Sequence, residues 1–452
     1  MAGGVEDRGG VTLRCRDGDP SCDVDAAADG TCLITSRVCI GPAACASEPL
    51  SFLRVRGRAG AALAAAVGGL PALDPGRCTT PASVTVRAGR ARRVRVKARG
   101  GDGTRDRDRL RVVCEGAESA RALVVTTDFE TGLLAGLRVL RPHRPRQLAT
   151  RIHADAVLRV HGGDVFVVNR FLGDNVQILN AAGGFRTRLQ CSTGAGSNPH
   201  DLVVAAPDKA YVTRYDRSAL WVVDPSSSGC AGFQRGSIEL GAVADADGLP
   251  ELDQMALVGG RLFVTAQRLD RRRGFAPTGP SALVVIDTTT DQVLQVVELQ
   301  GQNAFGDASG IQRHPAGGDL LLAQAGNVFR TGDGGIERVD PEALVSRGMV
   351  VTEEALGGSV TDFVLLSPTK GYAVVIDESL RNFVVSFDPS TGGAATRVFA
   401  SQQFIADVTR APDGTVWLAT RAGVRIVDPS TDQVRGRPLD VGLPPFAIAF
   451  LP

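Results

Sequence analysis

The sequence of 452 residues predicts an all-β protein: a seven-bladed β-propeller with 3+1 closure, preceded by a small disulfide-rich β-sandwich-like domain. Short apolar runs that end repeatedly in an Asp-Pro-like turn, with no helical periodicity between them, predict the propeller. The cysteines predict the leading domain, because seven of the nine lie at or before Cys114. We therefore expect a Cys-rich β domain with an Asp-rich loop at residues 1–118 and the propeller at residues 119–452.

Composition narrows the function classes. Hydrophobic residues make up 43% of the chain, but no run approaches the roughly 18 apolar residues of a membrane helix, so no transmembrane segment is expected. The net charge of +1 argues against a nucleic-acid partner, because such binding draws on an excess of basic charge. The expected partner is a protein or a small polar or anionic ligand.

Cysteine usage indicates an oxidising compartment. Cysteines this dense, without histidines beside them, are typical of disulfides rather than of zinc sites. The opening MAGGVEDRGG has neither the basic nor the apolar segment of a signal peptide. We expect an exported protein, periplasmic, at the cell surface or extracellular, whose leader is not present in this chain.

An acidic stretch overlaps the segment that Cys22 and Cys32 bracket. Its aspartates are Asp17, Asp19, Asp23, Asp25 and Asp29. Carboxylates at alternate positions direct several hard oxygens to one point, which Ca²⁺ requires. The stretch does not match an EF-hand loop; it resembles the Asp-rich, Cys-flanked calcium loops of thrombospondin-type repeats. Two interpretations stay open, a structural calcium site and a solvated acidic loop with Asx turns.

Three later segments of this domain alternate like strands, at residues 83–87, 92–97 and 110–113, with a charged turn at 102–108. One disulfide pattern that fits joins Cys22 to Cys32 and ties Cys114 back to an early strand. Connectivity does not follow from sequence.

The stretch 199–225 shows the propeller unit most clearly. Turn residues separate apolar runs at 202–206, 210–213 and 220–223, and a fourth strand near 237–240 completes a meander. Third strands end in a similar turn at seven places: Arg141, Asn180, Asp224, Asp287, Asp340, Asp388 and Asp428.

Two incomplete units predict how the propeller closes. Residues 122–127 form a second strand without a first, and residues 446–451 form a first strand without a second. We expect residues 446–451 to supply the innermost strand beside residues 122–127, which leaves no open sheet edge.

The motifs FVVN (166–169), YVTR (211–214) and FVTA (263–266), with third strands such as VVDP and VVID, resemble the YVTN-repeat propellers of surface-layer and periplasmic proteins. The resemblance covers the chain from about residue 120 onward. It implies the fold, export, and a binding role more often than catalysis, although propellers host many activities.

In a propeller, first strands start and second strands end on one face, around the mouth of the central channel; we call it the mouth face. Aspartates occupy the first position in five blades: Asp155, Asp201, Asp253, Asp362 and Asp407. Arginines occupy the second position in four: Arg170, Arg214, Arg268 and Arg421. We expect Asp to face Arg within each blade, with Asp377 replacing the arginine beside Asp362. The pairs are either structural staples or a polar ligand site.

His153 and His200 precede Asp155 and Asp201 on the same face. Two imidazoles and two carboxylates offer a divalent metal site. A propeller lactonase or a virginiamycin-lyase-like enzyme would use a metal or a base there, which makes a metal-assisted hydrolase or lyase the alternative function.

The preferred function is a non-enzymatic binding scaffold of the cell envelope or extracellular space, with its ligand at the channel mouth. Inserts at residues 268–280 and 302–309 should widen this mouth. Cys191 and Cys230 fall in neighbouring blades, but the strand assignment puts them at opposite faces, so no disulfide is expected between them.

Overall fold

A computed structural model describes residues 121–451 apart from 307–309, 329 and 394–395, together with the backbone of eight strands before residue 121. The chain divides into two compact units. One comprises residues 1–120, 138–142 and 452, and the other comprises residues 121–137 and 143–451.

The described strands of the first unit form two sheets. One has the order β1-β8-β7-β5, with β2 also paired to β8, and the other has the order β3-β4-β6. The strands are β1 (Glu6–Asp7), β2 (Gly10–Cys15), β3 (Asp23–Ala27), β4 (Thr31–Ser36), β5 (Leu50–Arg56), β6 (Ala82–Arg87), β7 (Ala91–Gly100) and β8 (Arg105–Cys114). The three predicted strands are β6, β7 and β8, but β8 begins at Arg105, so part of the predicted charged turn is strand.

The predicted calcium ligands lie largely outside the described residues. Asp17, Asp19 and Asp29 are not described, and only the backbone of Asp23 and Asp25 is described, as part of β3. The calcium site therefore stays a prediction.

The predicted disulfides of this unit also stay predictions, because Cys22 lies outside the described residues. In the parallel pairing of β2 with β8, Cys114 is the register partner of Cys15. This register places the last strand beside an early one, as the predicted tie of Cys114 requires.

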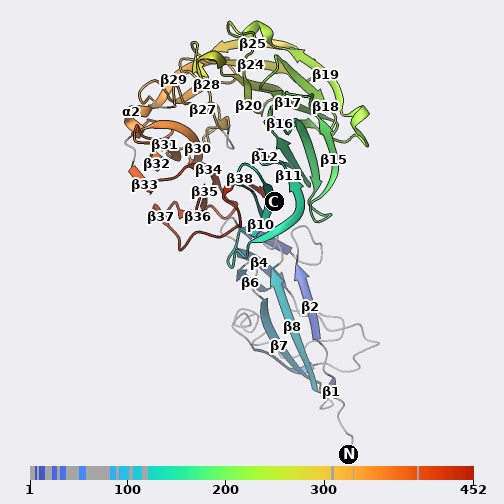
Figure 1. Cartoon of the computed structure of the whole chain (residues 1–452). Coiled ribbons are helices and arrows are strands. Elements are labelled where there is room, and N and C mark those ends of the chain that lie inside the picture. The colour runs from blue at the N-terminus through green and yellow to red at the C-terminus, as the bar shows by residue number, and fades with distance from the viewer. Residues whose placement is uncertain are drawn as a thin grey trace, which may run out of the picture. The chain divides into compact units, whose positions relative to one another are not determined.

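The second unit is a seven-bladed propeller of seven four-stranded sheets, with inner strands near the centre of the ring and outer strands at its rim (Figure 1). The inner strands are β12 (Ala156–His161), β16 (Pro199–Ala206), β20 (Leu252–Val258), β26 (Gln312–Arg313), β30 (Ser359–Ser367), β34 (Ile405–Arg410) and β38 (Pro445–Leu451). The second strands are β13 (Asp164–Asn169), β17 (Lys209–Arg214), β21 (Arg261–Ala266), β27 (Leu320–Gln324), β31 (Lys370–Ile376), β35 (Val416–Thr420) and β9 (Arg121–Thr127).

The outer half of each sheet follows the same order. The third strands are β14 (Asn175–Asn180), β18 (Ala219–Val223), β24 (Ala282–Asp287), β28 (Gly335–Asp340), β32 (Asn382–Phe387), β36 (Gly423–Asp428) and β10 (Gly132–Arg138). The outer strands are β15 (Arg186–Ser192), β19 (Gln234–Glu239), β25 (Val293–Glu298), β29 (Val345–Thr352), β33 (Thr396–Ser401), β37 (Gln433–Val434) and β11 (Arg146–Ile152). The 268–280 insert carries the short strands β22 (Leu269–Asp270) and β23 (Ala276–Pro277).

The predicted 3+1 closure is confirmed. The innermost strand β38 pairs antiparallel with β9, with Ile448 opposite Val124 and Leu451 opposite Arg121. The last strand thus completes the sheet that begins the propeller, and the ring has no unpaired edge at this seam.

Burial explains why the second strands are nearly continuous apolar runs. In β17 every residue from Ala210 to Arg214 is buried, and β13 is buried from Val165 to Asn169. Each sheet packs between two neighbours, so both faces of its middle strands are removed from water. One core cluster accordingly joins Tyr211 and Leu220 of one blade to Leu262 and Val284 of the next.

The recurrent aspartates at the ends of third strands form Asx turns. The carboxylates of Asp224, Asp287, Asp340, Asp388 and Asp428 each accept a backbone N–H from the residue two positions on. These bonds reverse the chain toward the outer strand. Hydrogen bonds from Ser430 hold the pKa of the Asp428 carboxyl at about 2.

A repeated clamp joins neighbouring blades near the rim. Tyr211 donates its hydroxyl to Asp291 in the turn of the next blade (2.6 Å), and Lys209 forms an ion pair with that carboxylate (2.8 Å). Tyr372 and Lys370 make the same two contacts with Asp432. The sequence carries this signal as KAY and KGY on second strands and as TDQV at 290–293 and 431–434.

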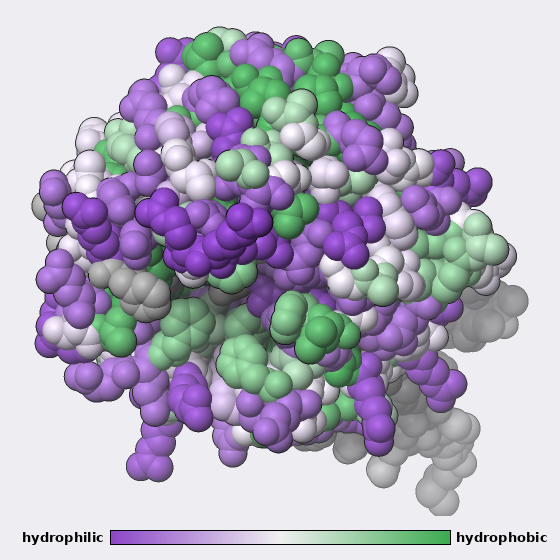
Figure 2. Space-filling model, turned by 45° about the horizontal axis from the view of Figure 1, so that its top comes forward, coloured by the Kyte–Doolittle hydropathy of each residue, from purple (hydrophilic) through white to green (hydrophobic). Residues whose placement is uncertain are grey.

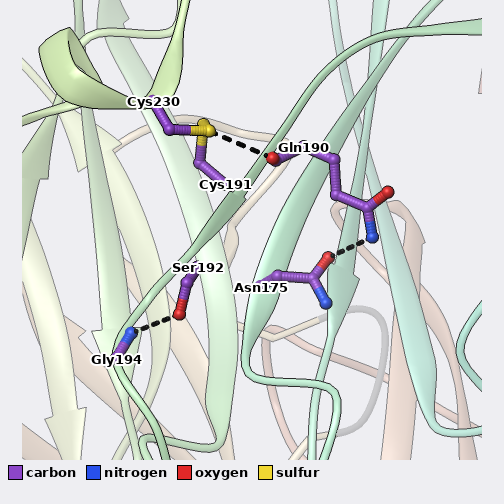
Figure 3. The surroundings of a disulfide bond; sticks show 6 residues. All are labelled: Asn175, Gln190, Cys191, Ser192, Gly194 and Cys230. Carbon is purple, nitrogen blue, oxygen red and sulfur yellow. Dashed lines mark hydrogen bonds between the residues drawn. A yellow bond between two sulfur atoms is a disulfide. The ribbon is translucent and has the colours of Figure 1, made fainter.

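The expectation that Cys191 and Cys230 stay apart is wrong. Cys191 in β15 and Cys230 in the short 3-10 helix η1 (Cys230–Gly232) form a disulfide, with 5.3 Å between their Cα atoms (Figure 3). The prediction placed the two cysteines from the strand assignment alone. The connection between β18 and β19 carries η1, which meets the outer strand of the preceding blade.

Candidate functional site

One predicted Asp–Arg pair forms within its blade. Arg170 lies 2.6 Å from the Asp155 carboxylate and donates from Nε to the same oxygen at 2.8 Å. Its guanidinium also lies over the ring of Phe446, 5.2 Å from the centroid. This pair is partly exposed at the start of β12 and the end of β13.

Three other aspartates, Asp201, Asp362 and Asp407, turn toward the next blade. For Asp201 and Asp407 the predicted in-blade pairing with an arginine is wrong; for Asp362 no arginine was expected. Each accepts a backbone N–H from the next inner strand. The bonds run from Met255 to Asp201 (2.8 Å), from Val408 to Asp362 (3.0 Å) and from Ile448 to Asp407 (2.6 Å). These carboxylates are buried, so they act as staples that join neighbouring blades.

Irregular strand pairing explains why these aspartates contact the next blade. The pairing of inner with second strands shifts register near the start of β16, β20, β30, β34 and β38. A bulge releases backbone N–H groups from the ladder and re-aims side chains. The adjacent carboxylate satisfies a released donor, and this local geometry has no signature in the spacing of Asp and Arg.

The predicted arginine partners have other roles. Arg214 donates to the Thr193 carbonyl (2.9 Å) and stacks over Trp221, 4.4 Å from the ring centroid. Arg268 pairs with Glu298 at 2.8 Å. Within the described part of the chain Arg421 makes no ion pair.

Asp201 and Asp377 each form an ion pair with an arginine that was not predicted as a partner. Arg159 of the preceding blade lies 2.6 Å from Asp201, whose pKa is raised because burial outweighs this pairing. Asp377, expected to lie beside Asp362 as an unpaired acid, forms an ion pair with Arg381 at 2.7 Å.

His200 belongs to a preorganised dyad. Its Nδ1 lies 2.9 Å from the carboxylate of Asp253, and its ring stacks on Tyr215 with centroids 4.1 Å apart and an interplanar angle of 12°. Asp253 also accepts from Gln267 at 2.9 Å, and Gln267 accepts from the Tyr215 hydroxyl at 2.8 Å. The His200 side chain is 17% exposed and the Asp253 side chain 4%, so the imidazole is the accessible member.

His153 takes no part in that dyad. The Nδ1 of His153 accepts the backbone N–H of Asp155 at 3.1 Å. The backbone N–H of His153 donates to the side-chain oxygen of Asn169 at 2.9 Å. Within the described part of the chain, no group of three or more His, Cys, Asp or Glu side chains is arranged to hold a metal ion. His153 and His200 thus take different partners in this structure, and the predicted metal site stays a prediction.

Arg271, which lies over the ring of Tyr215, pairs with a buried acid, Glu251. Glu251 is fully buried and accepts from Arg271 at 3.0 Å and from the backbone N–H of Leu269 at 3.1 Å. Burial raises its pKa to about 7. Arg271 also pairs with Asp216 at 2.6 Å, so the 268–280 insert is fixed to the blades at its base.

Sequence reasoning missed Tyr215, Glu251, Gln267 and Arg271. The signal available was position, because all four flank the strand ends that define the mouth face. The insert was predicted as a widening of the mouth, whereas Arg271 serves as an anchor.

Glu353 is a second buried acid on the mouth face. It begins the helix α2 (Glu353–Leu356) and accepts backbone N–H groups from Gly332 (3.0 Å), Gly334 (3.2 Å) and Val360 (3.1 Å). Burial raises its pKa to about 7. It thus joins α2 to a loop of one blade and the inner strand of the next.

This carboxyl predicts a pH-dependent stability. A folded pKa of about 7 lies above the ordinary value of 4.5, so the folded state binds the proton more tightly. The contribution is fully present below pH 4.5 and is lost as pH rises through 7, with a change of up to about 3 kcal/mol in the free energy of unfolding. Denaturant unfolding at pH 5 and pH 8 should show a smaller change for Glu353→Gln than for the wild type.

Glu354→Gln is the matched control, because Glu354 is exposed beside Glu353. It should keep the wild-type dependence. If Glu353→Gln unfolds with the same pH dependence as the wild type, the raised pKa of Glu353 is not its cause.

Large apolar side chains gather on the mouth face. Among the described residues, six exposed ones lie in connections of this face: Phe129, Phe171, Leu172, Phe275, Leu380 and Phe404. The other four, Leu257, Val293, Leu294 and Val345, lie within strands β20, β25 and β29. In the space-filling view, hydrophobic residues gather in patches beside a hollow in an otherwise polar surface (Figure 2).

Comparisons with known proteins bear on the fold alone. No protein-family model and no curated protein matches the chain, so membership of the YVTN-repeat family stays a prediction. None of the helices described here is long and apolar enough to span a membrane.

Solved structures match at low identity. One is a streptogramin B lyase, 15% identical, covering 66% of this chain and 87% of that chain with a TM-score of 0.46. BamB from Moraxella catarrhalis is 13% identical, covering 66% and 81% with a TM-score of 0.37. A chain of the mitotic checkpoint complex is 14% identical, covering 64% and 78% with a TM-score of 0.43.

Proposed function

We propose that the protein is an exported, non-enzymatic binding scaffold that engages a partner protein through the mouth face of its propeller. The carrying observation is the gathering of exposed apolar side chains in the connections of this face. Leu172 is 75% exposed, Phe129 66% and Phe171 56%. Exposed apolar surface concentrated on one face is typical of interaction sites, since each such side chain stays in contact with water until a partner covers it.

The state of the charged residues supports the same proposal. Asp201, Asp362 and Asp407 are buried and occupied by contacts between blades, so they hold the ring together rather than await a small ligand. The rigid ring then presents its connecting loops, which is how scaffolds commonly position binding residues.

Export is supported by cysteine chemistry. The Cys191–Cys230 bridge persists in an oxidising compartment, and Cys230 is exposed to solvent and its reductants. The dense cysteines before residue 121 and the YVTN-like motifs point the same way. A structural calcium ion in the Asp-rich stretch fits this environment.

Affinity capture with matched variants tests the scaffold. The bait is the purified chain, and the sample is the exported protein fraction of the source cells. The triple variant Phe129→Ser, Phe171→Ser, Leu172→Ser should lose a partner that the wild type retains, by at least tenfold. The control triple variant Val293→Ser, Leu294→Ser, Val345→Ser alters outer strands and should retain it. Equal recovery with all three baits would overturn the proposal.

A second function is favoured by the dyad of His200 and Asp253. A buried carboxylate that orients an accessible imidazole is the arrangement of a general base, which would remove a proton in a lyase or hydrolase reaction. His200 would supply this base, and Asp253 would orient its imidazole. Turnover of ester or lactone substrates that His200→Ala abolishes, with an unchanged melting temperature, would establish this function; absence of such turnover would exclude it for these substrates.

A further inference from the structure

A pocket opens on the mouth face between the sheets β26–β29 and β30–β33. Its volume is about 480 Å³. The lining includes Thr331, Glu353, Glu354, Asp377, Glu378 and Ser379. We call the pocket, together with the neighbouring Leu380 and Phe404, the acidic–apolar patch.

Four acidic side chains line the pocket, and they differ in their partners. Asp377 is paired with Arg381, and Glu353 is bonded to three backbone N–H groups. Glu354 and Glu378 form no ion pair with any described residue. Glu378 accepts only a hydroxyl hydrogen bond from Thr331 among these residues, at 3.2 Å.

The carboxylates of Glu354 and Glu378 lie against the same short loop. A Cβ built on Gly332 would lie 3.3 Å from Oε1 of Glu354, and Thr331 in the same loop donates to Glu378. A cation seated over this loop would therefore meet carboxylates from both sides of the pocket.

Two exposed apolar side chains, Leu380 and Phe404, lie in the connections that follow β31 and β33. Leu380 directly follows the lining residue Ser379 and is 57% exposed. Asn382 joins the segment of Leu380 to that of Phe404, because it donates to the Leu380 carbonyl (3.4 Å) and accepts the N–H of Ile405 (3.2 Å). The Phe404 side chain is 43% exposed.

We propose that the acidic–apolar patch binds a segment of a partner protein that carries a basic side chain followed closely by large apolar side chains. This inference rests on the proposed scaffold function and names the partner class of the same face. The basic group pairs with Glu354 and Glu378, and the apolar groups cover Leu380 and Phe404. The carboxylates of Glu354 and Glu378 select a partner segment with a basic side chain, and burial of apolar surface supplies the larger part of the affinity.

Fluorescence anisotropy with labelled synthetic peptides tests this binding. The probe Gly-Ser-Arg-Gly-Phe-Leu-Ser-Gly should bind at least tenfold more tightly than a version with Glu in place of Arg, and than a version with Ser-Asn in place of Phe-Leu. Its affinity should fall as sodium chloride is raised from 50 to 500 mM, because the charge pairs are exposed to solvent.

Variants locate the site. Glu354→Gln combined with Glu378→Gln should weaken the probe at least fivefold, as expected of two exposed ion pairs. Leu380→Ser combined with Phe404→Ser should weaken it similarly. The control Asp208→Asn removes an exposed acid at the β16–β17 turn, on the opposite face, and should leave the affinity unchanged.

Three outcomes overturn the inference: no binding of any probe, equal binding of the Arg and Glu probes, or equal binding by the wild type and both double variants. Failure here is distinguishable from failure of the scaffold function. If no probe binds while the Phe129, Phe171 and Leu172 variant still loses its captured partner, the patch proposal falls and the scaffold proposal stands.

Discussion

Removing residues 445–452 should leave a chain that does not fold into a propeller. The deletion removes the buried side chains of Phe446, Ile448 and Leu451. Full burial of such side chains contributes about 1.5–3 kcal/mol each, so roughly 5–9 kcal/mol is lost. That is comparable to the whole stability of a typical domain, about 5–15 kcal/mol. The deletion also exposes the edge of β9, which favours aggregation.

Tryptophan fluorescence and far-UV circular dichroism report the outcome. Trp417 packs edge-on against Phe450 with ring centroids 5.4 Å apart, so its emission senses the closing strand. A synthetic peptide of residues 443–452 added during refolding is the matched control and should restore the native signals. A deleted chain that melts cooperatively at the wild-type temperature would contradict the 3+1 closure.

Replacing both Cys191 and Cys230 by serine should lower the free energy of unfolding by about 4 kcal/mol, because the bridge closes a loop between residues 39 apart. For a propeller of this size that corresponds to a melting temperature lower by on the order of 6 °C. The double variant avoids leaving a free thiol that could exchange with the other cysteines. Wild-type protein treated with reductant should melt close to the double variant.

Peptide mapping without reduction provides the independent check. The digest should contain Cys191 and Cys230 in one linked fragment. Recovery of both residues as separate thiol-labelled peptides from oxidised native protein would refute the bridge.

The fold could be predicted because repetition averages over local irregularity. Second strands are buried on both faces, so their apolar runs stand out in each blade, and the unmatched segments at 122–127 and 446–451 revealed the seam. Asx turns at positions such as Asp224 and Asp428 marked the third strands for a physical reason, which is their bonds to the following backbone.

The site could be predicted only in part, because contacts there depend on local backbone geometry. The mouth-face placement of Asp155 and Arg170 followed from strand order, and their ion pair formed. Register shifts turned Asp201 and Asp407 to the next blade instead, and no residue spacing encodes such a shift. The bridge from Cys191 to Cys230 was missed because loop length, rather than strand order, sets where η1 lies.

The central claim is that the mouth face binds a partner, and site-specific photo-cross-linking in the exported fraction tests it most directly. A benzophenone amino acid would replace Phe171 or Phe404 on the mouth face, and Leu257 or Val293 elsewhere; all four side chains are exposed, so the positions are matched in access. The account predicts one partner adduct at Phe171 and Phe404 and none at the control positions. Adducts confined to Leu257 or Val293, or equal at all four positions, would contradict it.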